Sequence, residues 1–199
     1  RILFSRRVLI DKISGDDIIF SDESRFVLGT DNRWVWRRRG EEIDEIYEKR
    51  DKFPESVMIF AAVGKNFKTQ IMLVQDTIGA NDYQQLLSES QILEYLNDPE
   101  NCNLPYQQDN ATCHTASVRF IRKYCSLLGN WPPNSPDLNI IENIWAILKK
   151  AVEEVNPPTS ELLIETIKSA WDSIPITMIN KIVTTIEKRC ALVLKMKGN

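Results

Sequence analysis

Hydrophobic and polar positions along the chain follow two periods, one typical of strands and one typical of helices. Short apolar runs bounded by polar or turn-forming residues predict strands at about 17–28, 34–36, 57–63, 71–74 and 104–108. We expect the first run to form two strands joined by a tight turn, with Asp22 at the end of the first of them. The run at 57–63 is apolar throughout, which is typical of a buried central strand.

Apolar residues at steps of three and four predict the helices. They cover residues 81–97, a segment that begins at Thr115, residues 141–155, and two further segments at about 160–174 and 177–195. Successive prolines between Trp131 and Pro136 fix φ, so this segment is predicted to be a rigid, extended connector ahead of the helix at 141–155. Strands that alternate with helices predict an α/β fold with a mixed sheet.

The composition predicts one soluble domain. The chain has 199 residues, 43% of them hydrophobic, which is enough for one sizeable core. It contains no run of about 18 apolar residues, and its first residues do not resemble a signal peptide, so we expect an intracellular protein with no membrane partner. The four cysteines form no C-x-x-C pair, which disfavours a zinc knuckle or a disulfide scaffold, and we interpret them as free thiols.

Charge is unevenly distributed along the chain. The formal net charge of −3 does not by itself indicate a nucleic-acid-binding domain, because such domains usually carry a basic surplus. Carboxylates gather at residues 41–48, and positive side chains flank them at Arg37, Arg38, Arg39, Lys49, Arg50 and Lys52. A solvated mixed-charge loop and a DNA-contacting segment both fit this pattern.

Three carboxylates are candidates for metal-dependent chemistry: Asp22, Asp109 and Glu142. Hard divalent cations prefer oxygen ligands, and two such cations can activate the attacking oxygen and stabilise the leaving oxygen when a phosphodiester is cut. The predicted elements place two of these side chains after strands and one on a helix, where they can converge. Each also has a plain structural interpretation. Asp22 lies in a turn-like string, Asp109 fits an Asx turn, and Glu142 follows Asn139 at the spacing of a capping box. Spacing alone leaves both interpretations open.

The residues around these carboxylates form a more specific pattern. The chain reads FSDESRF at 20–26, QDN at 108–110, SPDLN at 135–139 and IENIW at 141–145. Together with His114-Thr115, and with Arg189 near the end of the chain, these strings resemble the Tc/mariner transposase superfamily over nearly the whole chain. The resemblance implies an RNase H-like fold, with a mixed five-stranded sheet flanked by helices, an inserted loop at about 37–56 after the first hairpin, and C-terminal helices at about 160–199.

The resemblance also implies the roles of the site residues. Asp22, Asp109 and Glu142 would be the ligands of two Mg²⁺ or Mn²⁺ ions, which places the chain in the branch of the family whose third carboxylate is a glutamate. Three further residues would orient these ligands without binding the metal themselves: Asn110, His114 and Asn143. For His114, a purely structural hydrogen bond is an equal alternative; it is not a triad histidine, because no G-x-S-x-G elbow accompanies it. Trp145 and Trp171 lie on apolar helix faces and are interpreted as core residues.

The function implied by the resemblance is cut-and-paste DNA transposition. The enzyme would cut the ends of its transposon and join the freed 3′ hydroxyl to target DNA at a TA dinucleotide, as a homodimer on paired ends, in the nucleus of a eukaryotic host or otherwise in the cytoplasm. The inserted loop would contact DNA or the partner subunit. The helix-turn-helix modules that recognise transposon ends are expected to precede this chain. The alternatives are an RNase H-like nuclease without strand transfer and a host-adapted DNA-binding protein that has lost catalysis.

The chain departs from the family pattern at two places. Only 32 residues lie between Asp109 and Glu142, fewer than in the better-known members, and the shortfall falls before Trp131. We therefore expect a tighter strand between Tyr124 and Trp131. Ile140 replaces the usual proline of the SPDLNPIE string, so the following helix is expected to begin differently.

Overall fold

A mixed five-stranded sheet forms the centre of the molecule. The structure is a computed structural model that describes residues 1–29, 55–75 and 77–198. Two long antiparallel strands, β1 (Ile19–Val27) and β2 (Ser56–Gly64), pair along their whole length. The short strands β3 (Phe67–Lys68) and β4 (Met72–Val74) add to β2, and β5 (Tyr106–Gln107) adds to β1 in parallel. The sheet thus contains the predicted number and mixture of strands.

The prediction of two strands joined by a turn at 17–28 was wrong. β1 is one strand of nine residues, preceded by the 3₁₀ turn η1 (Gly15–Asp17). Asp22 therefore lies in the middle of β1, opposite Ala61 of β2, and not at a strand end. The polar residues from Ser21 to Ser24 do not interrupt the strand, because they stay in register with β2 and the side chains of Ser21 and Glu23 find partners on one face of the sheet.

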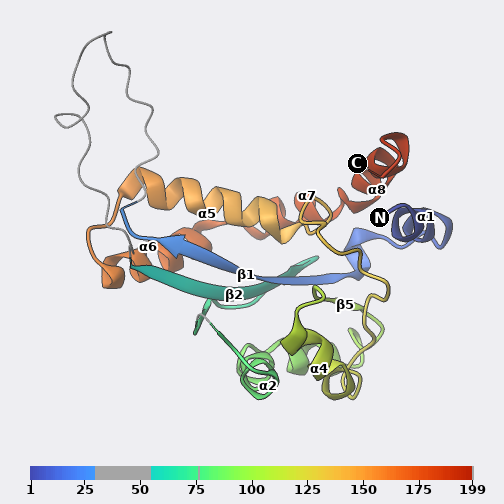
Figure 1. The fold of residues 1–199 in the computed structure, drawn as a ribbon, viewed down its shortest axis with the longest axis horizontal. Coiled ribbons are helices and arrows are strands. Elements are labelled where there is room, and N and C mark those ends of the chain that lie inside the picture. The colour runs from blue at the N-terminus through green and yellow to red at the C-terminus, as the bar shows by residue number, and fades with distance from the viewer. Residues whose placement is uncertain (30–54, 76, 199) are drawn as a thin grey trace, which may run out of the picture.

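Helices cover both faces of the sheet (Figure 1). The first face carries α5 (Ile141–Val155), α6 (Ser160–Ser173) and α7 (Ile176–Val183). The second face carries α2 (Ala80–Glu89), α3 (Ile92–Asn97) and α4 (Thr112–Ile121). Because side chains along a strand alternate between faces, Phe20 of β1 joins the core under α5 while Ile19 joins the core against α2 to α4.

The two tryptophans predicted to be core residues are buried against the sheet. Trp145 of α5 and Trp171 of α6 are each 1% exposed, and their ring centroids lie 5.9 Å apart. Trp171 Nε1 donates to the carbonyl oxygen of Thr69 at 2.8 Å. Lys68 of β3 donates to the carbonyls of Trp171 and Ile174 and so holds the end of α6 on the sheet.

Several predicted helix boundaries need correction. The helix at 81–97 is divided into α2 and α3, because Gln91 adopts a left-handed conformation with φ 65°. The helix at 177–195 is divided into α7 and α8 (Ile186–Lys195). There the hydroxyls of Thr184 and Thr185 donate to carbonyls three residues earlier, in competition with the helical bonds. α4 begins at Thr112, three residues before the predicted start.

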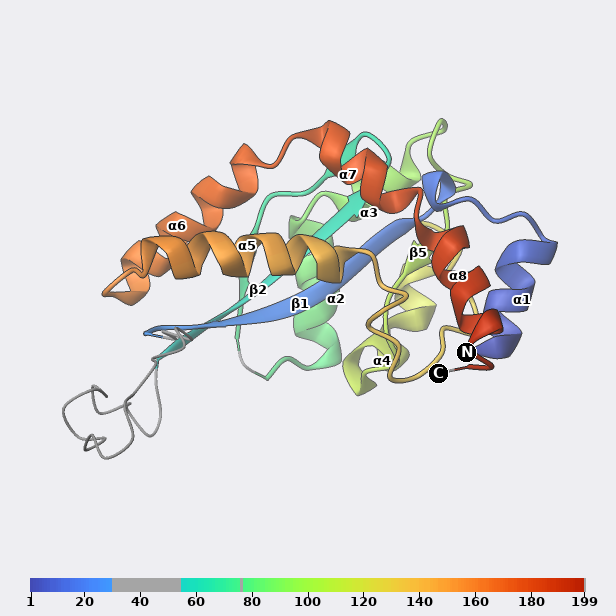
Figure 2. The same ribbon diagram turned by 90° about the horizontal axis from the view of Figure 1, so that it is seen from above.

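A helix that the sequence pattern did not predict opens the chain. α1 (Ile2–Ile10) packs beside α8, and both views show the pair at one end of the molecule, with the two termini close together (Figures 1 and 2). Phe4 of α1 contacts Trp131 edge-on, with ring centroids 5.2 Å apart. The first and last helices therefore meet the segment that leads to α5.

Some predictions fall outside the described residues. The strand at 34–36 and the cationic residues Arg37, Arg38, Arg39, Lys49, Arg50 and Lys52 lie there, as does nearly all of the insertion predicted at about 37–56. Within the described ranges, no helix combines the length and apolarity needed to cross a membrane. The four cysteines are free thiols, as predicted, and Cys125 and Cys190 are buried.

Candidate active site

An open cleft of about 410 Å³ lies where β1, the end of β5 and the start of α5 meet. It is lined by all three candidate carboxylates, Asp22, Asp109 and Glu142, and by the proline-rich segment at 131–136. From here on, the connector means residues 131–140, which lead to α5. In the part of the chain that the structure describes, no three acidic, histidine or cysteine side chains lie close enough together to hold one metal ion between them.

The three carboxylates reach the cleft from three different elements. Asp22 shares the face of β1 that carries Phe20 and lies beneath α5. Asp109 follows β5, the parallel neighbour of β1. Glu142 lies in the first turn of α5. The pairing of β5 with β1 and the packing of α5 on the sheet therefore bring together residues that are far apart in the sequence.

Asp22 has an unusual electrostatic environment. Burial, and then the negative charges of Glu23, Glu142 and Asp109, raise the pKa of its carboxyl group to about 8. Each of these causes disfavours the ionised form. A cation in the cleft would relieve the repulsion and restore the carboxylate.

Asp109 makes a turn and also faces the cleft. Its Oδ1 accepts from the backbone N–H of Ala111 at 2.9 Å, which is the predicted Asx turn, and lies in contact with His114 Nδ1. The hydrogen bond with His114, which outweighs the opposing effect of burial, lowers the pKa of Asp109. The turn interpretation and the metal-ligand interpretation of this residue are thus compatible.

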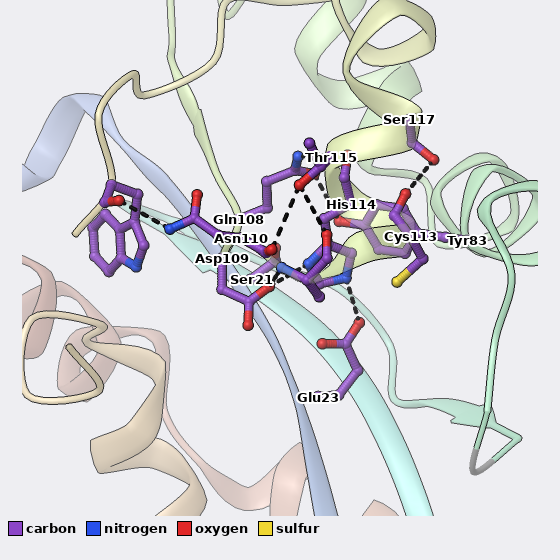
Figure 3. A network of polar contacts seen from close by, with 12 residues as sticks. Ser21, Glu23, Tyr83, Gln108, Asp109, Asn110, Cys113, His114, Thr115 and Ser117 are labelled. Atoms are coloured by element: carbon purple, nitrogen blue, oxygen red, sulfur yellow. Dashed lines mark hydrogen bonds and ion pairs between the residues drawn. The ribbon is translucent and has the colours of Figure 1, made fainter. Parts of the chain in front are cut away.

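His114 connects α4 to the sheet (Figure 3). Its ring is 4% exposed, with Nδ1 bound to Asp109 and Nε2 lying 3.2 Å from Glu23 Oε1. Burial favours the neutral ring, but the hydrogen bonds and charges of Asp109 and Glu23 outweigh it and raise the pKa of His114 to about 10. A histidine held by two carboxylates in this way orients Asp109.

Glu23 is a site residue that sequence reasoning missed. Asp22 and Glu23 are consecutive in a strand and therefore project to opposite faces, one toward α5 and the other toward His114 of α4. The apolar pairs at 19–20 and 26–27 were the signal that could have revealed it, because they can be the two ends of a single strand with Asp22 and Glu23 on its opposite faces. The interpretation of this string as a turn concealed the signal.

Buried polar side chains hold β1 and β5 together beneath the cleft. Ser21 Oγ bonds to the Tyr106 hydroxyl at 2.6 Å and donates to the Gln107 carbonyl at 2.9 Å. The Tyr83 hydroxyl of α2 lies 3.1 Å from that of Tyr106 and donates to Gln108 Oε1 at 3.1 Å. Burial raises the pKa of Tyr83, so its hydroxyl stays protonated and can donate.

The capping box that Asn139 and Glu142 could form is not present. α5 begins without a side-chain cap, and Asn139 Nδ2 instead donates to the carbonyl of Ser21 at 3.2 Å. Asn139 thereby ties the connector to the residue before Asp22. Ile140 has φ −69°, an angle that proline also adopts, and α5 begins directly after it at Ile141.

The two asparagines predicted to support the site both make structural contacts. Asn110 Nδ2 donates to the carbonyl of Trp131 at 3.0 Å, which joins the end of β5 to the connector. Asn143 Oδ1 accepts from Arg189 of α8 at 2.6 Å.

Arg1 forms a bidentate ion pair with Asp137 of the connector, with N–O distances of 2.7 and 2.6 Å.

The shortened stretch before Trp131 pairs with the sheet only briefly. Tyr106 donates to the Ser126 carbonyl at 2.8 Å and accepts from the Leu128 N–H at 2.9 Å. This is a single parallel bridge between Tyr106 and Leu127, in place of the tight strand expected between Tyr124 and Trp131. The segment in which the shortfall lies therefore makes only this bridge to the sheet, and Glu142 still lines the cleft.

Comparison with known proteins places this arrangement in a family. The family model described as "DDE superfamily endonuclease" matches residues 17–164, which include all three carboxylates of the cleft. The chain belongs to the DDE superfamily endonuclease family. This membership confirms the resemblance to the Tc/mariner transposases that the motifs indicated.

Transposases from nematodes are among the relatives of this DDE family chain. It is 36% identical to the Tc3 transposase of Caenorhabditis elegans over 189 residues, and 29% identical to the Tc1 transposase of the same organism over 191 residues. The alignments cover 92% and 90% of the chain, and 56% and 68% of the relatives. The chain thus spans only about half the length of the Tc3 transposase.

Solved transposase structures share the fold of the DDE family chain. The catalytic domain of the Mos1 mariner transposase superposes with a TM-score of 0.73 at 18% identity, covering 100% of this chain and 89% of that domain. A pre-cleavage Mos1 transpososome matches with a TM-score of 0.80 at 18% identity, covering 100% of this chain and 60% of the other. The RNase H-like α/β fold expected from the motifs is confirmed.

Proposed function

We propose that this chain is the catalytic domain of a cut-and-paste DNA transposase. It would cut DNA at the ends of its transposon and join the freed 3′ hydroxyl to target DNA. The observation that carries the proposal is the convergence of Asp22, Asp109 and Glu142 on one open cleft in a chain of the DDE family. The Tc3 and Tc1 transposases and the Mos1 transpososome support it by similarity.

The residues of the cleft fit divalent cations. All three donors are carboxylates, the ligands that Mg²⁺ and Mn²⁺ prefer. Burial, and then the negative charges of Glu23, Glu142 and Asp109, raise the pKa of Asp22, and a bound cation would favour its charged form. We propose two Mg²⁺ or Mn²⁺ ions, held by Asp22, Asp109 and Glu142. When bound, they would supply charge stabilisation at the phosphate and activate the attacking oxygen.

The residues around the cleft would have different roles in binding and orienting the metal ligands. Asp22 and Asp109 would offer oxygens from the sheet and Glu142 from α5, on opposite sides of the cleft. His114 would orient Asp109 through the hydrogen bond to Oδ1, with Glu23 holding the far side of the ring. Asn110 would keep the connector against the end of β5.

Two further parts of the proposal concern partners. We propose that the cationic residues of the insertion contact double-stranded DNA, and that two copies of the protein act together on paired transposon ends. DNA affinity should then fall steeply with salt, and less steeply after neutralisation of Arg37, Arg38 and Arg39, because fewer counterions would be released. Light scattering of the protein bound to end-containing duplexes would report the two-copy assembly.

Loss of one carboxylate tests the catalytic assignment. Asp109→Ala is expected to reduce Mn²⁺-dependent nicking of supercoiled plasmid by about 1,000-fold or more, since one ligand of the catalytic cations is lost. Asp172→Ala is the matched control, because Asp172 is an exposed carboxylate on α6 outside the cleft. Undiminished nicking by Asp109→Ala would contradict the enzymatic assignment.

Strand transfer separates the proposed function from its closest alternative. A duplex with a free 3′ hydroxyl at the transposon end, incubated with Mn²⁺ and a target plasmid, should yield a covalently joined product. Hydrolysis without joined product would indicate an RNase H-like nuclease. Binding of DNA with neither reaction would indicate a DNA-binding protein that has lost catalysis.

A further inference from the structure

Arg189 extends from α8 to the junction between the connector and α5. Its Nη1 donates to the Asp137 carbonyl at 2.7 Å and its Nη2 donates to Asn143 Oδ1 at 2.6 Å. Its Nε donates to Thr185 Oγ1 at 2.9 Å, which holds the guanidinium against its own helix. One planar side chain therefore joins three elements.

The two outer contacts of Arg189 lie on either side of Glu142 in the chain. Asp137 precedes Glu142 within the connector, and Asn143 follows it directly in the first turn of α5. That turn has no side-chain cap of its own. A rigid guanidinium fork at this junction limits the rotation of the turn, and with it the direction in which the Glu142 carboxylate points.

Helix stabilisation does not explain an arginine at this position. The N-terminus of a helix carries a partial positive charge, so a guanidinium beside the first turn of α5 is unfavourable by itself. Burial also lowers the pKa of Arg189, and the charge of Asp137 only acts against that shift. The arrangement is costly for α5 as a helix, whereas it is useful for holding the first turn in one orientation.

Helix α8, which carries Arg189, is itself held in place. α8 packs along α1, and Cys190, the neighbour of Arg189, is fully buried. Arg1, which directly precedes α1, donates to the Asp137 carboxylate, and Arg189 donates to the Asp137 carbonyl. The terminal helices thus fix the connector from one side, and Asn139 fixes it to β1 from the other.

We infer that Arg189 is a positioning residue for Glu142, and that the terminal helix α8 thereby sets the geometry of the cleft. This inference rests on the proposed metal-binding role of Glu142. Arg189 acts through Asp137 and Asn143, while other residues line the cleft itself. Its loss should weaken metal binding in a protein that still folds.

Mn²⁺ binding to the complete chain, measured by calorimetric titration, tests the inference. Arg189→Lys keeps the charge but cannot span both acceptors, and it should weaken Mn²⁺ binding by about tenfold, the effect typical of losing an outer-shell contact. Asn143→Ala should shift the affinity in the same direction by less. Lys188→Met, an exposed neighbour on α8, is the matched control and should bind Mn²⁺ as the wild type does.

The outcomes separate this inference from the proposed function. If the wild type does not bind Mn²⁺, or if Asp109→Ala binds it equally well, the proposed function fails. If Asp109→Ala loses binding while Arg189→Lys and Asn143→Ala both bind as tightly as the wild type, the positioning role is overturned. Circular dichroism melting identifies variants that do not fold. Should Arg189→Lys be among them, the exposed Asn143→Ala decides the question alone.

Discussion

Asp22 and Asp109 are held by the sheet, whereas Glu142 lies in the first turn of α5, directly after a connector without regular structure. Strand pairing and the buried network of Ser21, Tyr106 and Tyr83 fix the first two. The connector that delivers Glu142 is fixed by single contacts from remote parts of the chain. The same cleft therefore combines a rigid half with a half whose geometry depends on a few side chains, and substitutions should affect the two halves differently.

The largest expected effect concerns charge in the rigid half. Because the folded-state pKa of Asp22 is raised from 3.8 to about 8, the folded protein retains a proton that the unfolded chain releases, so stability falls as pH rises from about 4 to 8. Asp22→Asn cannot ionise and should abolish nicking, yet without metal it should raise the free energy of unfolding at pH 8 by on the order of 5 kcal/mol.

Urea unfolding in EDTA at pH 4 and pH 8 measures this effect of Asp22→Asn. The gain should be present at pH 8 and nearly absent at pH 4. Asp109→Asn provides the contrast, because the pKa of Asp109 is lowered by His114 and its charged form is stabilising. It should lower stability at pH 8. A loss of stability in Asp22→Asn at pH 8 would show that burial and the neighbouring carboxylates do not disfavour the charged form of Asp22.

The next effect concerns the link between the two halves. Asn139 is 5% exposed, and its side chain donates to the carbonyl of Ser21. Asn139→Ala should lower the free energy of unfolding by about 2 kcal/mol, because a buried carbonyl loses its partner. It should also weaken Mn²⁺ binding, since the connector is released. Asn97→Ala, at an exposed end of α3, is the control. Unchanged Mn²⁺ affinity would mean that the connector is held without this bond.

A substitution within the network of the rigid half should be milder. Tyr83→Phe removes the hydroxyl that donates to Gln108 and should cost about 1 kcal/mol of stability. The bonds from Ser21 to Tyr106 and Gln107 remain in this variant and still hold β1 to β5. The positions of Asp22 and Asp109 should therefore not change, and Mn²⁺ affinity should stay within about twofold of the wild type. Denaturation and calorimetric titration measure both. A large loss of Mn²⁺ affinity would place the weak point in the sheet and not in the connector.

The smallest effect is expected at the terminal ion pair. Arg1 and Asp137 are 22% and 51% exposed in their side chains, so solvent screens their attraction. Arg1→Gln should cost about 0.5 kcal/mol, an amount that melting curves at low and high salt can resolve from the wild type. High salt should diminish the difference. If Arg1→Gln lowered the free energy of unfolding by more than Asn139→Ala does, the Arg1 contact and not the Asn139 contact would be the stronger of the two that hold the connector.

Much of the fold could be predicted because local patterns were unambiguous. The apolar run within β2 and the apolar stripe of α5 have the lengths and periods of those elements, and the structure places both where the pattern did. The strand β1 was misread, since the five consecutive polar residues at 21–25 look like a turn unless their partners in the fold are known. The division of α7 from α8 depended on hydroxyls that turn back to the helix carbonyls.

The sequence by itself determined the identities of the three carboxylates and the motif that relates them to the DDE family, because these are properties of residue type and spacing. Only the tertiary structure decided how they meet. It put Asp22 at mid-strand, paired Glu23 with His114 across the other face of β1, and brought Arg189 to the start of α5. Such contacts join residues that are distant in the chain, and no local period encodes them; they follow from the packing of helices on both faces of one sheet.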